Sequence, residues 1–244
     1  GTNPVDVMVH PSGRYVYAVN TNSNNVSVYT INTTTGALVP AGTTETHRAP
    51  VSIAIHPSGQ YAYVANAFGG NVSQYAIAAD GGLVPMSTAT VAAGTSPQAI
   101  TVDPMGKFAY VANISSNDVS HYTIGGDGSL TFVATYAAGI NPRFIAVDPT
   151  GKFAYVANFG SNRVSIYAIL SVSGALAPLG TIAARATVAS ISLARGAAPV
   201  VYTPKFAYVL TNTGTSISAY TIDASTGALT AAGVPPADDG AGVG

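Results

Sequence analysis

The feature that most constrains the fold is a short segment that returns five times along the chain. A run of the form YVAN ends at Asn20, Asn66, Asn113, Asn158 and Asn212. The successive asparagines are 46, 47, 45 and 54 residues apart, and the last interval is longer because of an insertion around Arg195–Pro199. A nearly fixed period of this length is typical of chains that repeat one supersecondary unit.

Each repeat contains four segments that we predict to be strands, because apolar, β-branched and aromatic residues alternate in them. The second is the YVAN run, the third resembles Val26–Ile31, and the fourth begins near Leu38 after a Gly-containing turn. A turn of the form His/Asp-Pro-x-Gly joins the first two strands in four repeats. The first strands are predicted at Val5–Val9, Val51–Ile55, Gln98–Val102, Arg143–Val147 and Ala189–Leu193.

Four strands per 45 to 50 residues predict an all-β protein, a β-propeller of five four-stranded blades with almost no helix. We expect one domain over residues 1–233, followed by a tail or linker at 234–244 that is rich in Gly and Pro. The expected blades span about 3–47, 48–94, 95–139, 140–185 and 186–233.

The composition excludes some classes of function. Only 8% of the 244 residues are charged, against about 25% in ordinary domains. With a net charge of −1 and no basic run, nucleic-acid binding is not expected. No apolar stretch approaches 18 residues, and cysteine is absent. The low charge favours an extracellular, cell-surface or periplasmic location; the chain itself shows no export signal, so we expect any such signal to lie upstream.

Residues that recur in every repeat are predicted to be scaffold, because one active site needs only one set of groups. We expect the tyrosine rings to fill the wedge between neighbouring sheets, with the hydroxyls reaching backbone or water. The repeated asparagines are expected to hold the loops that follow them. The two tyrosine sets are Tyr17, Tyr63, Tyr110, Tyr155 and Tyr208, and Tyr29, Tyr75, Tyr122, Tyr167 and Tyr220.

The pattern PSGxYxYVAN, then NxVSxYTI, then a TGAL turn resembles the YVTN-repeat propellers and the lactonase-type seven-bladed propellers, which include a bacterial 6-phosphogluconolactonase. The resemblance covers essentially the whole chain and implies the fold. It does not by itself imply an activity, because propellers host enzymes, binding proteins and surface-layer modules. The five repeats either close as a five-bladed ring, which we favour slightly, or form part of a larger array such as a seven-bladed propeller.

Departures from the repeat are the best candidates for a functional site. They gather in the loops that join strand two to strand three and each blade to the next, which share one face of a propeller. A metal-free hydrolase would need a general base and a cationic clamp for a phosphate or carboxylate. These groups would require Asp6, His47 and two arginines to converge around one pocket. The arginines would be drawn from Arg48, Arg143 and Arg185. The candidate ligand-binding residues are Asp6, His47, Arg48, Phe68, Gln98, Asp118, Arg143, Phe159, Arg163 and Arg185.

No cofactor or metal is expected. Metal centres need three or four converging ligands, and the chain has a single Glu, at position 45. His10 and His56 occupy the turn position that is Asp in later repeats, so we predict turn roles for them. His121 lies within a third strand and is predicted to be partly buried or on an outer face. The sequence also lacks a G-x-S-x-G nucleophile motif.

Two kinds of function remain open. The first, which we favour from sequence, is a non-enzymatic binding or scaffold propeller whose loop face takes a protein, a glycan or a small molecule. Assembly into a larger surface array is an open alternative within this interpretation. The second is a metal-free, lactonase-like hydrolase that acts on a sugar lactone. A carbohydrate-binding propeller is a further alternative, for which Phe68, Phe144 and Phe159 are the available aromatic platforms.

Overall fold

The computed structural model describes residues 1–32, 34–184, 188–195, 204–211, 217–223 and 225–231, and of these it describes only the backbone at 194–195, 204–211 and 217–220. Every regular element in the described residues is a β-strand, which confirms the all-β prediction. The strands form five four-stranded antiparallel sheets, each with its strands in chain order from one edge to the other.

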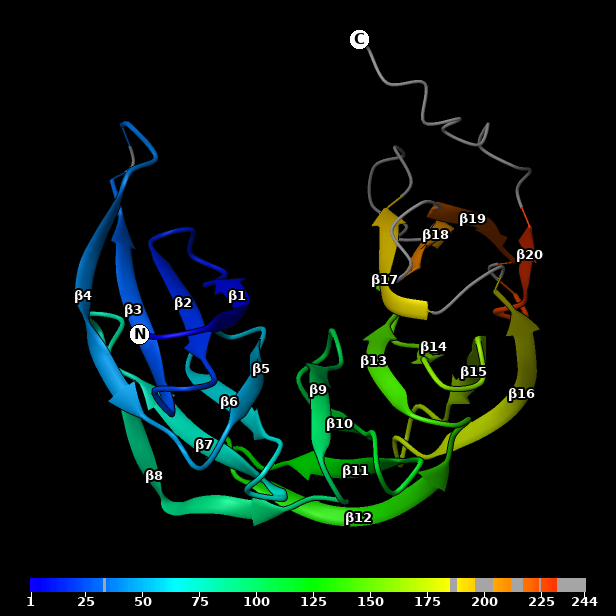
Figure 1. Cartoon of the computed structure of the whole chain (residues 1–244), viewed down its shortest axis with the longest axis horizontal. Coiled ribbons are helices and arrows are strands. Elements are labelled where there is room, and N and C mark those ends of the chain that lie inside the picture. The colour runs from blue at the N-terminus through cyan, green and yellow to red at the C-terminus, as the bar shows by residue number, and fades with distance from the viewer. Residues whose placement is uncertain (33, 185–187, 196–203, 212–216, 224, 232–244) are drawn as a thin grey trace, which may run out of the picture. The chain divides into compact units, whose positions relative to one another are not determined.

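The chain divides into two compact units, residues 1–137 and 138–244. Figure 1 draws the three sheets of the first unit in blue, cyan and green. They consist of β1 (Pro4–Val9), β2 (Tyr15–Asn20), β3 (Asn25–Ile31) and β4 (Leu38–Glu45); β5 (Pro50–Ile55), β6 (Tyr61–Asn66), β7 (Asn71–Ile77) and β8 (Leu83–Ala92); and β9 (Pro97–Val102), β10 (Phe108–Asn113), β11 (Asp118–Ile124) and β12 (Leu130–Ala137).

The second unit holds the remaining two sheets, which run from green to red in Figure 1. They consist of β13 (Pro142–Val147), β14 (Phe153–Asn158), β15 (Arg163–Ile169) and β16 (Leu176–Ala183); and β17 (Val188–Arg195), β18 (Pro204–Thr211), β19 (Ile217–Ile222) and β20 (Leu229–Ala231).

The first strand of each sheet begins at a proline in the first four repeats, one residue earlier than predicted. Proline is tolerated there because this strand is an edge of its sheet and the ring has no N–H to donate. A bulge follows immediately, so that Asp6 rather than Val5 is the next residue paired with β2. The same register shift occurs at Pro50/Ser52 and Pro142/Phe144.

Tyrosines join neighbouring sheets within each unit, as predicted. The hydroxyls of five buried tyrosines each donate to a backbone carbonyl of the adjacent sheet instead of facing water. Tyr208 and Tyr220 lie outside the described side chains. The bonds run from Tyr17 to Gly81 O (2.9 Å), Tyr63 to Gly128 O (2.7 Å), Tyr155 to Gly227 O (3.2 Å), Tyr75 to Glu45 O (2.7 Å) and Tyr122 to Ala92 O (2.7 Å).

The repeated asparagines are buried and hold the loop that follows, also as predicted. In the second sheet the Asn66 amide donates to Asn71 Oδ1 and Ser73 Oγ, each at 2.9 Å. In the third the amide of Asn113 donates to the Asp118 carboxylate at 2.7 Å. Asn212 lies outside the described residues.

The histidines of the first two turns do more than the predicted turn role. His10 Nδ1 accepts from the backbone N–H of Ser12, while Nε2 lies 2.8 Å from Gly59 O of the second sheet. His56 makes the same kind of contact with Gly106 O of the third sheet, at 3.0 Å. The aspartate at the equivalent position, Asp103, instead accepts three backbone N–H groups of its own turn.

His121 corrects one prediction, because it is fully buried and not partly exposed. Its ring stacks on Tyr110 at 5.2 Å between ring centres and lies 5.6 Å from Phe108 and 6.0 Å from Tyr136. Neither ring nitrogen has a hydrogen-bond partner in the described part of the chain. The equivalent residue of the second sheet, Gln74, is also fully buried, so this position of the third strand faces the interior in both sheets.

Candidate functional site

Asp6 is half-buried on β1, and its hydrogen bonds give it a structural role. Its Oδ1 accepts the N–H of Val7, and its Oδ2 accepts the N–H of Ile53 in the second sheet, both at 2.9 Å. Burial raises the pKa of the Asp6 carboxyl, and hydrogen bonds from Ile53, Ser52 and Val7 oppose that rise. The carboxylate therefore links two neighbouring first strands.

His47 and Gly69 form a matched exception to the repeat. Gly94 and Gly139 occupy the place of His47 in later repeats, and there a serine, Ser116 or Ser161, occupies the place of Gly69. A Cβ on Gly69 would lie 2.4 Å from His47 Nδ1, so the imidazole takes the space of the missing serine.

The His47 ring is anchored by a defined hydrogen-bond chain. Because Asn71 Oδ1 accepts from Asn66, the other end of the Asn71 amide, Nδ2, faces His47 Nδ1 at 3.1 Å and donates to it. The neutral ring then carries its proton on Nε2, which favours hydrogen-bond donation over proton abstraction at that atom. No hydrogen bond joins His47 to Asp6 among the described residues.

Two other predicted residues of the first unit also support loops. Asp118 accepts from Asn113 Nδ2 at 2.7 Å and from Ser116 Oγ at 3.0 Å. Arg48 is exposed, and its backbone carbonyl accepts the N–H of Gly69 at 3.1 Å. Gln98 is half-buried at the bulge of β9.

In the second unit, the Arg143 guanidinium lies over the Phe159 ring, 5.0 Å from its centre. The exposed Arg163 turns to the fourth strand of its own sheet and donates from Nε to Thr181 Oγ1 at 2.7 Å. Phe144 is half-buried against the core of that unit. Arg185 lies outside the described residues.

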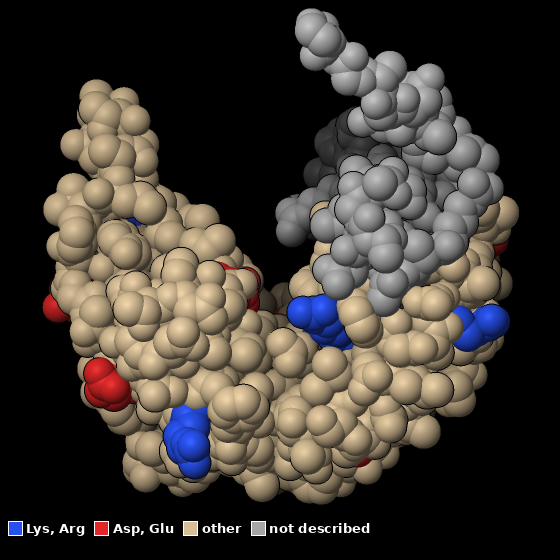
Figure 2. All heavy atoms as spheres, viewed as in Figure 1, with Lys and Arg blue, Asp and Glu red and all other residues tan. Residues whose placement is uncertain are grey.

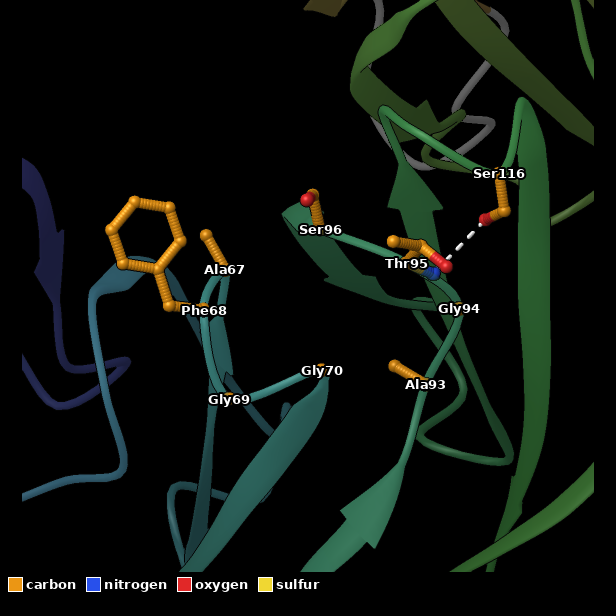
Figure 3. Close-up of a pocket in the computed structure, with 9 residues that line it drawn as sticks. All are labelled: Ala67, Phe68, Gly69, Gly70, Ala93, Gly94, Thr95, Ser96 and Ser116. Atoms are coloured by element: carbon orange, nitrogen blue, oxygen red, sulfur yellow. Dashed lines mark hydrogen bonds between the residues drawn. The ribbon is translucent and has the colours of Figure 1, made fainter.

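A cavity of about 530 Å³ opens in the first unit between the β6–β7 loop and the β8–β9 loop (Figure 3). The exposed Phe68 side chain, 78% accessible, stands on one side, and Thr95 and Ser96 stand on the other. Thr95 N–H donates to Ser116 Oγ at 3.1 Å, which fixes the far wall. The lining residues are Ala67, Phe68, Gly69, Gly70, Ala93, Gly94, Thr95, Ser96 and Ser116.

Among these lining residues the sequence had singled out Phe68 alone. The sequence feature that could have indicated the other lining residues is the loop Ala67–Gly70. In this loop two glycines replace the Ser-Asn pair that ends the same loop in the first, third and fourth repeats. Of these two glycines only Gly70 leaves open space, because a Cβ there would meet no atom within 4 Å, whereas the His47 ring fills the space beside Gly69.

The described residues contain no group of three or more His, Asp or Glu side chains placed to hold a metal ion. In the same part of the chain, no helix has the length and apolarity to cross a membrane. Figure 2 shows charged side chains scattered singly over the face drawn, without a basic or acidic patch.

Comparison with solved structures finds the same fold repeatedly. A protein of unknown function from Desulfotomaculum acetoxidans matches with a TM-score of 0.81 and 18% identity, covering 96% of this chain and 70% of that one. A proposed 6-phosphogluconolactonase from Bacteroides uniformis gives 0.81 and 21%, covering 94% and 69%. The periplasmic gluconolactonase of Pseudomonas aeruginosa gives 0.79 and 19%, covering 93% and 68%.

A search of curated proteins finds no match. The model of the lactonase, 7-bladed β-propeller family matches residues 1–55 and 43–191. That match covers well over half of the chain, in agreement with the repeated four-stranded sheets. The chain is therefore a member of the lactonase seven-bladed β-propeller family.

Proposed function

We propose that this chain binds a sugar lactone in the cavity between the β6–β7 and β8–β9 loops and hydrolyses it. The observation that carries the proposal is this cavity on the loop side of a chain that belongs to the lactonase family. Two structurally similar proteins are described as a 6-phosphogluconolactonase and a gluconolactonase, names that denote hydrolysis of sugar lactones, and this supports the proposal.

The cavity has the size and chemistry that a sugar-sized ligand needs. A volume of about 530 Å³ lies within the range of small-molecule sites, roughly 300–1,000 Å³. The Phe68 ring offers an apolar platform for the C–H face of a sugar, and the hydroxyls of Thr95 and Ser96 offer neutral hydrogen-bonding groups. The Ser116 hydroxyl is already engaged, since it donates to Asp118 and accepts from the Thr95 N–H.

Hydrolysis of a lactone adds water to the acyl carbon, breaks the ring C–O bond and leaves a carboxylic acid and a hydroxyl. Neutral donors that face the acyl oxygen stabilise the negative charge that develops on it. Serine and threonine hydroxyls at the cavity can take that part.

Binding of a carbohydrate without turnover is the second candidate. It is favoured by the cavity lining, which in the described residues includes no carboxylate or imidazole to act as a general base. The two candidates share the ligand class and differ in whether the ring ester is opened.

Hydrolysis of D-glucono-δ-lactone and its 6-phospho derivative, followed by acid release above the spontaneous rate, tests the proposal. We expect turnover by the wild type and at least a tenfold loss of kcat/KM in Phe68→Ala. Phe132→Ala serves as the matched control, because Phe132 is also exposed but lies on β12 away from the cavity lining. If lactone hydrolysis stays at the spontaneous rate while D-gluconate binds, the chain is a binding protein and not a hydrolase. If it neither hydrolyses the lactones nor binds D-gluconate, both candidate functions are refuted.

A further inference from the structure

A loop position next to the cavity differs from its equivalents in a way that removes a hydrogen-bond acceptor. The loop that joins the second and third strands of a sheet ends at an asparagine in three repeats, namely Asn24, Asn117 and Asn162. All three have a left-handed backbone conformation, with φ between 51° and 58°. In the second repeat Gly70 takes this place, with φ 61°. Asparagine adopts this backbone conformation readily, so the conformation alone does not require glycine.

The asparagine side chain has a clear task in the first repeat. Asn24 Oδ1 accepts the backbone N–H of Ala49 at 2.7 Å. Ala49 is the residue just before β5, also in left-handed backbone with φ 53°. The carboxamide oxygen thus satisfies an N–H that faces the loops and not a neighbouring strand.

In the second repeat the equivalent N–H belongs to Ser96, the residue just before β9, with φ 56°. Gly70 has no side chain to accept it, and no described residue takes the place of the acceptor. A Cβ on Gly70 would meet no atom within 4 Å, so the space into which an asparagine side chain would leave the backbone is open. Both Gly70 and Ser96 line the cavity (Figure 3).

We infer that the space vacated by the asparagine carboxamide is a subsite for a carbonyl or carboxylate oxygen of the ligand, held by the Ser96 N–H. A ligand oxygen there would repeat the geometry that Asn24 Oδ1 has with Ala49. The hydroxyls of Thr95 and Ser96 lie on the same wall, and Phe68 stands across the cavity to contact the carbon skeleton.

The inference rests on the proposed function and narrows its ligand class. Sugar lactones and sugar acids carry the required carbonyl or carboxylate oxygen next to several hydroxyls, whereas a simple polyol carries hydroxyls alone. Backbone N–H donors bind carboxylates without a cationic side chain, and the charge assistance strengthens the bond.

The test is an NMR titration of the ¹⁵N-labelled chain with D-gluconate, with sorbitol as the uncharged polyol comparison. In the wild type the Ser96 amide proton moves downfield with D-gluconate and not with sorbitol. In Gly70→Asn, which restores the residue of the other repeats, the carboxamide fills the subsite. The Ser96 amide of this variant no longer responds, and D-gluconate binds at least tenfold more weakly.

Asn24→Gly is the matched control. It makes the reverse exchange at the equivalent loop outside the cavity, and it keeps wild-type D-gluconate affinity. An unresponsive Ser96 amide in the wild type, an equal response to sorbitol, or unchanged affinity in Gly70→Asn would each overturn the subsite. If lactone hydrolysis is absent while the Ser96 amide responds as expected, the subsite stands and the hydrolase proposal fails. If Gly70→Asn hydrolyses the lactone at the wild-type rate, the hydrolase proposal stands and the subsite fails.

Discussion

At the scale of single residues, symmetry between repeats separates scaffold from candidate site. Phe68 stands out in the sequence because the first, third and fourth repeats carry small or polar residues at the equivalent loop position. These are Asn22, Ser115 and Gly160. Gly70 and Ser96 do not stand out, since a glycine in place of an asparagine resembles ordinary drift until the structure shows the acceptor that is lost. Asp6 was expected to carry chemistry, but the sequence cannot show that the Ile53 N–H of the next sheet lies opposite it.

The burial of His121 predicts a pH dependence of stability. Desolvation lowers the pKa of its imidazole in the folded protein, and the aromatic side chains Phe108, Tyr110 and Tyr136 pack against it. The unfolded chain, with an ordinary histidine pKa near 6.5, then binds the proton more readily. The free energy of unfolding contributed by neutral His121 is therefore present above about pH 6.5 and is lost as the pH falls below it, by up to about 1.4 kcal/mol per pH unit.

Urea unfolding of the wild type and of His121→Ile between pH 5 and 7 measures this contribution. Isoleucine is the residue at the equivalent position of the fourth sheet, Ile166, so the substitution suits the site. The variant should lose most of the decline in unfolding free energy toward pH 5. An unchanged pH profile would show that His121 is not its source.

At the scale of strands and sheets, the sequence predicted most of the architecture. Alternating apolar residues and His/Asp-Pro-x-Gly turns located the strands to within a residue or two, because both depend on local chemistry. The bulge after each first-strand proline was not predicted, since it arises from pairing with the next strand. The cross-sheet contacts of His10 and His56 were missed for the same reason, because they depend on where the neighbouring turn lies.

Tyrosine hydroxyls should contribute measurably to packing between sheets. Tyr75 is buried and donates to Glu45 O at 2.7 Å, whereas Tyr29, at the same repeat position, is half-buried and has no such bond in the described structure. We expect Tyr75→Phe to lower the free energy of unfolding by about 0.5–1.5 kcal/mol and Tyr29→Phe to change it little. Chemical denaturation of both variants compares them, and equal losses would contradict a specific role for the Tyr75 bond.

At the scale of the whole molecule, the repeat period was enough to predict the fold, and the family match confirms it. The function was harder to predict, because in propellers it resides in loops whose sequences vary while the sheets stay constant. The sequence favours a non-enzymatic binding or scaffold protein, whereas the family match supports the lactonase-like alternative better. An extracellular, cell-surface or periplasmic location, and the manner in which the blades complete a ring, stay predictions.

The central claim is that the cavity between the β6–β7 and β8–β9 loops receives a sugar lactone or its acid. The most direct measurement is a crystal structure of the chain with D-gluconate. We predict electron density for the ligand between Phe68 and Ser96, with a carboxylate oxygen within hydrogen-bond distance of the Ser96 backbone nitrogen. Density at another place on the molecule, with this cavity holding only solvent at saturating D-gluconate, would contradict the claim.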